Sequence, residues 1–184
     1  MKKFIFIFIG LIFSGNNNCQ ELKINDIVLD SVNSISEQKA FLEEIFFKDQ
    51  RVRENEIQMN INCGYKSFDH LIAIKEMLRI DSINLINIKQ FLIKFGYPNP
   101  DSVGEIACLT PLLAIHHCGY AEIQLEFFSI LYNAWKIGYI DNNRYKLFLS
   151  RLLSRMGIQV DNLTLNELIL ECKKKIKYDF DNNK

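Results

Sequence analysis

Apolar residues recur every three or four positions along most of the chain after residue 33, which is the spacing of one buried face of an α-helix. Convincing alternation of apolar and polar residues is limited to 22–29, a segment that is either a short strand or a tether. The periodic stretches predict helices over residues 34–59, 69–79, 81–95, 102–118, 123–137, 145–156 and from 164 onward.

Capping residues mark several of the expected helix ends. The Ser/Thr-x-x-Glu pattern of a capping box opens three of them, at Ser34 with Glu37, Ser102 with Glu105, and Thr164 with Glu167. Asp81 is predicted to cap the helix that stops at Gly96, where a glycine just past the end and Pro98 beyond it are typical of a helix C-terminus. Pro111 must either kink or restart the helix that contains it.

These segments predict an all-α fold, a single compact domain of six or seven amphipathic helices arranged as an irregular bundle over 34–180. Without its first 19 residues the chain keeps about 165, which is enough for one domain with one sizeable core. Phe127 and Leu149 lie centrally on apolar stripes, so we expect both in that core. Residues 19–33 are interpreted as a flexible leader.

The N-terminus has the pattern of an export signal. Lys2 and Lys3 precede a ten-residue apolar block over 4–13 that only Gly10 interrupts, and Ser14 and small polar residues follow. As a helix, the block would span about 15 Å, roughly half of a bilayer's hydrocarbon core, which argues against a permanent membrane anchor. We therefore expect residues 1–18 to be a signal peptide and the protein to be periplasmic or secreted.

Cys19 offers an alternative fate for the exported chain. Cleavage directly before this cysteine would leave it available for a lipid, whereas cleavage near Gly15 would release a protein without an anchor. Lipoprotein signals place a small residue before the cysteine, and asparagines fill positions 16–18 here. Lipid attachment at Cys19 is thus the secondary prediction, and it is the one route besides the signal by which we expect membrane contact.

The charge balance narrows the class of partner. The chain has 22 basic and 22 acidic residues, and loss of Lys2 and Lys3 would leave 20 against 22, a net charge of −2. This is not the basic footprint of a nucleic-acid-binding protein, so the expected partner is a protein or a small molecule. The one run of lysines, over 173–177, is interpreted as the solvated C-terminal end of the last helix.

Cysteines and histidines do not predict a metal or cofactor site. The four cysteines after Cys19 permit disulfides in an oxidising compartment, but buried free thiols are an equal alternative in a chain of this length. His116, His117 and Cys118 are ligand types that zinc prefers, yet adjacent residues of a helix point about 100° apart. The same geometry argues against a catalytic pair of His117 and Cys118, and we expect no metal and no cofactor.

Asp49, Gln50 and Arg53 form the most distinctive polar group. Asp49 and Arg53 are four positions apart on the first predicted helix, beside its apolar stripe rather than opposite to it. Such a pair is either an ordinary surface ion pair, worth under about 1 kcal/mol, or part of a polar pocket between helices.

A series of short motifs resembles the pattern of a family of bacterial proteins of unknown function, exported or cytoplasmic. In that family an Asp-Gln-x-x-Arg start is followed by a Gly-Trp-Pro turn, a Gln-His pair, an Asp-Arg pair and a closing Gln-Tyr-Gly-Thr-Gln. The matching positions, over about 47–159, are Asp49-Gln50-x-x-Arg53, Asp81-x-x-Asn84, Gly96-Tyr97-Pro98, Val103-Gly104, His117, Ser150-Arg151 and Gly157-x-Gln159. The resemblance rests on the shared order of these motifs.

Four departures from the family pattern bear on its site. Tyr97 replaces the tryptophan, His116 replaces the glutamine before the histidine, and Ser150 replaces the aspartate before Arg151. After Gln159 the Tyr-Gly-Thr-Gln segment is absent. If that segment completes a site in the family, the site of this chain is altered or lost.

The resemblance implies that polar residues on core-forming helices gather into one site. They are Asp49, Gln50, Arg53, Asp81, Asn84, His117 and Arg151. The first hypothesis for their function is a non-catalytic envelope protein that binds a ligand or a partner. The alternative is a small hydrolase-like enzyme in which His117 works with Asp49 or Asp81 in acid–base catalysis. Under both hypotheses we expect Asp49, Arg53, Asp81 and His117 to converge, because a lone charge beside an apolar stripe is expensive to bury.

Overall fold

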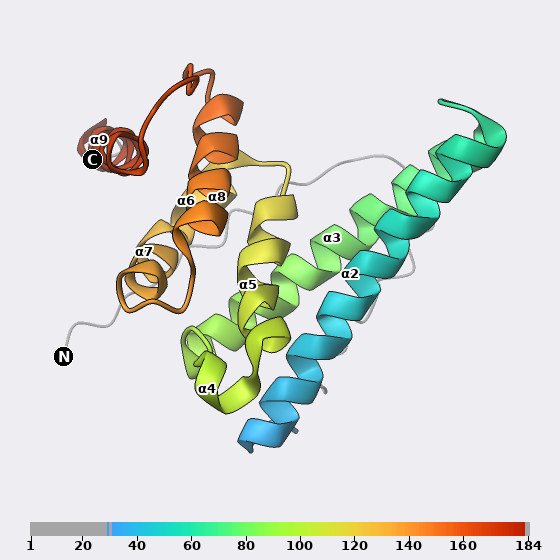
Figure 1. Cartoon of the computed structure of the whole chain (residues 1–184), viewed down its shortest axis with the longest axis horizontal. Coiled ribbons are helices and arrows are strands. Elements are labelled where there is room, and N and C mark those ends of the chain that lie inside the picture. Colours follow the sequence, from blue (N-terminus) through green and yellow to red (C-terminus); the bar gives the residue numbers. More distant parts are fainter. Residues whose placement is uncertain (1–28, 30, 183–184) are drawn as a thin grey trace.

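The computed structural model describes Leu29 and residues 31–182, which form helices and no strand (Figure 1). The all-α fold, predicted as one irregular bundle, is confirmed. The helices are α2 (Ile35–Cys63), α3 (Phe68–Phe95), α4 (Pro100–Val103), α5 (Glu105–His117), α6 (Ala121–Glu126), α7 (Phe128–Lys136), α8 (Asn142–Arg155) and α9 (Leu165–Asn182). None of the helices among the described residues is long and apolar enough to cross a membrane. The predicted signal peptide and Cys19 lie outside the described residues.

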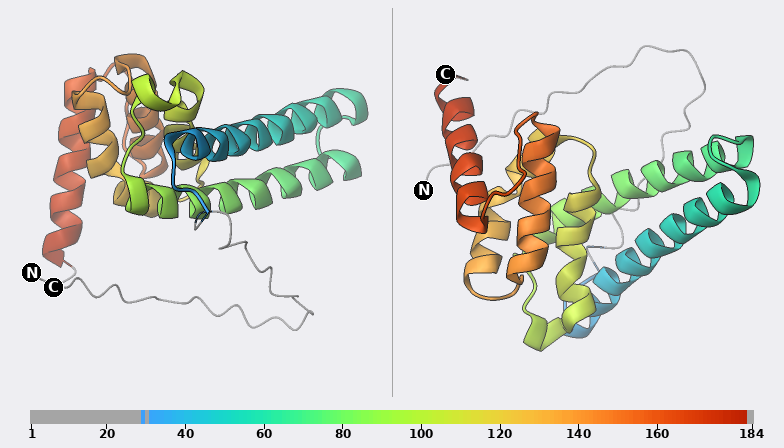
Figure 2. Two further views of the ribbon diagram at one scale, coloured as in Figure 1. Left: turned by 90° about the horizontal axis from the view of Figure 1, so that it is seen from below. Right: turned by 45° about the horizontal axis from the view of Figure 1, so that its top comes forward.

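Helices α2 and α3 form a long antiparallel hairpin whose far end projects beyond the other helices (Figures 1 and 2). The predicted capping box opens α2, since the Ser34 Oγ accepts from the Glu37 backbone and the Glu37 carboxylate accepts from the Ser34 backbone. Gly64 ends α2 with φ 88°, and Ser67 caps α3. Helix α5 packs across the near half of the hairpin and contacts both of its helices. The polar cluster described below lies at this three-helix junction.

The prediction of two separate helices over 69–79 and 81–95 was wrong, because α3 is continuous from Phe68 to Phe95. Neither glycine nor proline lies in this stretch to interrupt the helix. Asp81 does not cap a helix; its side chain is buried and bonds to Arg53 of α2. Gly96, with φ 74°, ends α3 as expected.

Corrections also apply between residues 99 and 138. Ser102 lies inside α4, which Asn99 caps ahead of Pro100, and α5 begins after Gly104 without a side-chain cap. Pro111 lies inside α5 and does not end it. The helix expected over 123–137 is two helices, because the chain turns at Phe127 between α6 and α7.

The C-terminal part closes the bundle with α8 and α9 (Figure 2). Thr164 and Glu167 form the predicted capping box ahead of α9. The sequence predicted that the lysine run over 173–177 ends the last helix. This was wrong, because α9 continues to Asn182. Phe127 and Leu149 are both buried in the core, as predicted.

The same core extends to the described residues before α2 and includes three cysteines. Val32 is buried, and the Lys94 ammonium donates to the backbone carbonyls of Leu29 and Val32. Cys108, Cys118 and Cys172 are buried free thiols, and Cys63 is an exposed free thiol at the end of α2. Of the two alternatives for these four cysteines, the structure has free thiols.

Candidate functional site

Asp49, Arg53, Asp81 and His117 converge where α2, α3 and α5 meet, as expected. The Asp49 Oδ1 atom lies 2.8 Å from Nδ1 of His117, which is 68 positions away in the sequence. Arg53 holds the same carboxylate with two donors, Nη2 to Oδ1 at 3.1 Å and Nε to Oδ2 at 3.2 Å. Its Nη2 also donates to Asp81 Oδ1 at 2.5 Å. One guanidinium therefore joins two carboxylates from the two helices of the hairpin.

Asp49 is the centre of the cluster. Its carboxylate is buried and accepts hydrogen bonds from His117, Arg53 and Gln50, the last from Nε2 to Oδ2 at 2.8 Å. Burial alone would raise the pKa of Asp49, but the hydrogen bonds and charges of His117 and Arg53 outweigh burial and lower this pKa. The carboxylate therefore stays ionised and acts only as an acceptor.

For Asp81, the contributions to the pKa add up in the opposite direction, and the pKa is raised. Burial raises the pKa of Asp81 more than the charges of Arg53 and His117 lower it, and the negative charge of Asp49 adds to the rise. Arg53 is the one member that links both carboxylates, and its Nη1 also lies 3.4 Å from the Met77 sulfur. Two neighbouring carboxylates thus have pKa values shifted in opposite directions.

His117 is oriented by the cluster through Nδ1, and its side chain is partly exposed. Because an ionised Asp49 can only accept, Nδ1 of His117 carries the hydrogen that joins them. The side chain is 14% exposed, and its Nε2 has no hydrogen-bond partner among the described residues. Nδ1 is thus fixed on a buried carboxylate while Nε2 remains available to a ligand.

His116, the neighbouring histidine, has a different environment. Its side chain is buried, and burial, followed by the charges of Arg151, His117, Arg155 and Arg53, lowers the pKa of His116 to about 4. His116 therefore stays neutral near pH 7.

Gln124 and Arg155, which sequence reasoning missed, hold the end of α5 in place. The Gln124 amide donates to the carbonyls of Ile115, His116 and Cys118, and the Arg155 guanidinium donates to those of His116 and Cys118. These bonds satisfy carbonyls that a helix end leaves without partners. The backbone that carries His117 is therefore fixed from α6 and α8.

The remaining predicted members lie at the edge of the cluster. Gln50 bonds to Asp49 from an exposed position. Asn84 is buried one turn beyond Asp81, and its Nδ2 has no hydrogen-bond partner among the described residues. Arg151 is exposed on α8, close enough for its charge to lower the pKa of His116, and it makes no ion pair within the described part of the chain. Arg151 therefore borders the group rather than joining its hydrogen bonds.

Asp49, Asp81 and His117 also present three donor atoms of the types that bind metal ions. One atom from each lies within 4.8 Å of the others. The Arg53 guanidinium, however, already contacts both carboxylates and supplies the positive charge between them. These residues could hold a divalent cation only if Arg53 left its place.

A second buried histidine was not predicted. His70 accepts from the Lys66 backbone through Nδ1 at 2.9 Å, and its Nε2 lies 2.7 Å from the Glu56 carboxylate. Since Nδ1 accepts, the hydrogen is on Nε2 and points to Glu56. No spacing motif joins residues 14 apart on two helices, so the sequence held no signal for this pair.

The far end of the hairpin exposes large apolar side chains. The exposed fraction is 69% for Ile61, 73% for Tyr65 and 77% for Phe68. Cys63, an exposed free thiol, lies between them in the sequence. We call these four residues the hairpin tip.

Comparison with protein-family models, curated proteins and solved structures finds no match to this chain. The resemblance to the family with the Asp-Gln-x-x-Arg start therefore remains a prediction.

Proposed function

We propose that the chain is a small hydrolase-like enzyme whose acid–base residue is His117. The observation that carries this proposal is the bond of 2.8 Å between Nδ1 of His117 and the buried Asp49 carboxylate, in a partly exposed ring whose Nε2 has no partner among the described residues. The Nδ1–H tautomer of an imidazole has its free lone pair on Nε2, where a general base must be able to meet its substrate.

The proposed role of His117 is to remove a proton from water as the water attacks an ester or phosphoester bond. Asp49 keeps the imidazole in the Nδ1–H tautomer and stabilises the imidazolium that forms, while Arg53 and Gln50 keep Asp49 ionised and in place. The proton then passes from Nε2 to the leaving oxygen. The proposed role of Arg151, which is exposed on α8 and whose charge acts on the neighbouring His116, is to attract an anionic substrate.

The tautomer of His117 is the first test, and it needs no substrate. In ¹⁵N-resolved NMR spectra of the intact protein near pH 7, we expect the Nδ1–H form for His117. Asp49→Asn should change the tautomer or its population, whereas Asp101→Asn, which alters an exposed carboxylate on α4, should not. An Nε2–H form in the unmodified protein would remove the general base from the solvent side and contradict the proposal.

Hydrolysis is the second test. We expect slow turnover of p-nitrophenyl acetate, p-nitrophenyl phosphate or bis(p-nitrophenyl) phosphate, reduced about 100-fold or more in His117→Gln. His117→Gly should regain part of this rate with added imidazole. Equal rates for the unmodified protein and His117→Gln on all three compounds would refute the catalytic role.

The hairpin tip favours a second candidate function, that of a non-catalytic envelope protein that binds a partner. Large apolar side chains that gather in one exposed place mark interaction sites more often than isolated ones do. A photo-crosslinking amino acid at Tyr65 in the native host should then give one discrete adduct. The same residue at Glu122, exposed on α6, is the control, and equal adduct patterns at both positions would contradict a binding role for the tip.

A further inference from the structure

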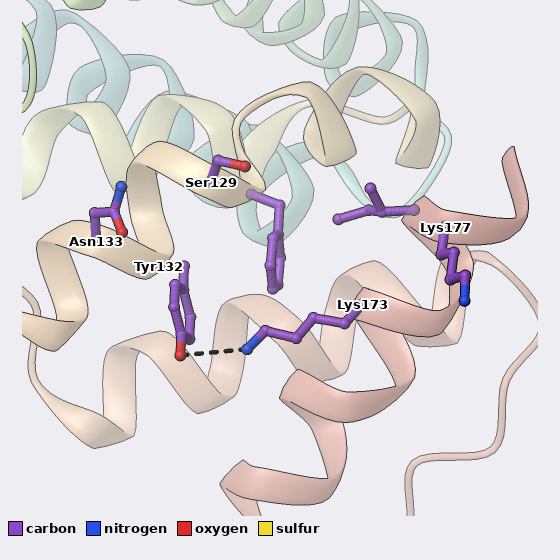
Figure 3. Close-up of a pocket in the computed structure, with 7 residues that line it drawn as sticks. Ser129, Tyr132, Asn133, Lys173 and Lys177 are labelled. Atoms are coloured by element: carbon purple, nitrogen blue, oxygen red, sulfur yellow. Dashed lines mark hydrogen bonds between the residues drawn. The ribbon is translucent and has the colours of Figure 1, made fainter. Parts of the chain in front are cut away.

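A groove lies between α7 and α9 (Figure 3), and none of its lining residues belongs to the His117 site. Its volume is about 480 Å³, within the usual range of about 300–1,000 Å³ for small-molecule pockets. The residues that line it are Phe128, Ser129, Tyr132 and Asn133 from α7, and Lys173, Ile176 and Lys177 from α9. The proposed enzymatic function uses none of them.

Among the described residues that line this groove, positive charge has no negative counterpart. Two lysines one turn apart on α9 face it, and none of the ion pairs among the described residues involves Lys173 or Lys177. Lys173 extends across the groove to Tyr132, with Nζ 3.3 Å from the hydroxyl and 4.3 Å from the ring centroid (Figure 3). The lining residues that the structure describes include no carboxylate. Because the chain as a whole has zero net charge, this excess is a local feature.

The remaining lining is apolar and aromatic, with two neutral hydrogen-bonding side chains. The rings of Phe128 and Tyr132 are stacked, with centroids 5.8 Å apart and planes 12° apart, and Ile176 faces them from α9. Ser129 and Asn133 add a hydroxyl and an amide on the α7 side. An occupant that complements this lining carries a negative charge and an apolar body.

We propose that the groove between α7 and α9 binds a small amphipathic anion, a single apolar chain that ends in a carboxylate or phosphate. The anionic head pairs with a lysine ammonium, that of Lys173 or Lys177, and the apolar chain covers Phe128 and Ile176. A volume of about 480 Å³ suits one small molecule of this kind, so the proposed ligand is the free molecule in solution and not a lipid within a membrane.

Trp135 provides a direct readout of binding, because it is the one tryptophan of the chain and its ring centroid lies 5.6 Å from that of Tyr132. Titration of the full protein with octanoate should change the Trp135 fluorescence saturably. Acetate has the head without the chain, octanol the chain without the charge, and octylamine the opposite charge. Each should bind at least about tenfold more weakly than octanoate, and added salt should weaken octanoate binding.

Two double variants test whether octanoate binds in this groove. Lys173→Gln with Lys177→Gln should weaken octanoate binding about tenfold or more. Lys136→Gln with Lys174→Gln removes the same charge from α7 and α9 outside the groove and should leave the affinity unchanged. Far-UV circular dichroism checks that both double variants fold, and the octylamine and salt series on the unmodified protein test the charge requirement independently of them.

Three results would overturn the proposal. They are equal affinity for octylamine and octanoate, equal loss of octanoate binding in both double variants, and binding to phosphatidylglycerol vesicles with no response to octanoate. The last result would identify a membrane surface as the partner.

Discussion

Arg53 stabilises the polar cluster because its guanidinium contacts both buried carboxylates. Arg53→Ala would leave Asp49 and Asp81 buried without that charge, and we expect the free energy of unfolding to fall by about 3–5 kcal/mol. Urea denaturation measures this loss. Arg79→Ala is the matched control, since Arg79 pairs with Glu76 at 2.7 Å on the exposed side of α3 and should contribute less than about 1 kcal/mol. Similar losses for the two variants would mean that the cluster is only a surface ion pair.

His116 should make the stability depend on pH. Because burial and nearby cations lower the pKa of His116 to about 4, the unfolded chain binds a proton between about pH 6.5 and pH 4 that the folded protein does not. Stability should therefore fall with decreasing pH across this range, by roughly 3 kcal/mol from this one group.

Comparison with His116→Phe separates this effect from other titrating groups. Urea denaturation at pH 6.5 and 4.5 should show a smaller loss in the variant than in the unmodified protein. Asp81, whose pKa is raised, contributes a slope of the opposite sign, so the difference between the two proteins is the quantity that matters. If both lose the same stability, His116 is not a neutral buried group.

Single residues also show what the sequence could predict about the site. The spacing of Asp49 and Arg53 placed them on one face of a helix, but spacing alone could not bring in Asp81 or His117 from other helices. Their place in the site came from the order of motifs that the chain shares with the resembling family. Where no such order existed, as for His70 and Glu56, the contact was missed.

At the scale of the helices, apolar periodicity located the core correctly. Leu149→Ala and Phe127→Ala should each lower the free energy of unfolding by about 2–5 kcal/mol, because both side chains are buried. Leu147→Ala and Phe68→Ala are matched controls with exposed fractions of 61% and 77%. Thermal or urea denaturation that shows losses below about 0.5 kcal/mol for both buried positions would mean that these positions contribute little to the core.

Helix ends were predicted less well than helix faces, for a physical reason. An aspartate beside an apolar stripe is as compatible with a cap as with a buried partner, and only the contact with Arg53 decides for Asp81. At Phe127 the chain turns although the sequence there carries neither glycine nor proline. Tertiary packing determines both the burial of Asp81 and the turn at Phe127. A local sequence pattern carries no information about that packing.

At the scale of the whole molecule, export remains a prediction from the first 19 residues. Intact-mass measurement of the protein from the envelope of its native host should show loss of about 15 to 18 residues, as the basic start and short apolar block predict. A diacylglycerol mass on Cys19 would establish the lipid-anchored alternative. Full-length protein in the cytosol would contradict export.

The α2–α3 hairpin has a consequence for how its two helices align. Apolar contacts between long helices are nearly interchangeable if one helix slides past the other by a turn, about 5.4 Å. The Arg53–Asp81 and Glu56–His70 contacts are not interchangeable in this way, because each needs a particular donor opposite a particular acceptor. The two polar cross-links therefore select a single register. Since Arg53 also holds the carboxylate that orients His117, the site is assembled only in the hairpin that has found this register.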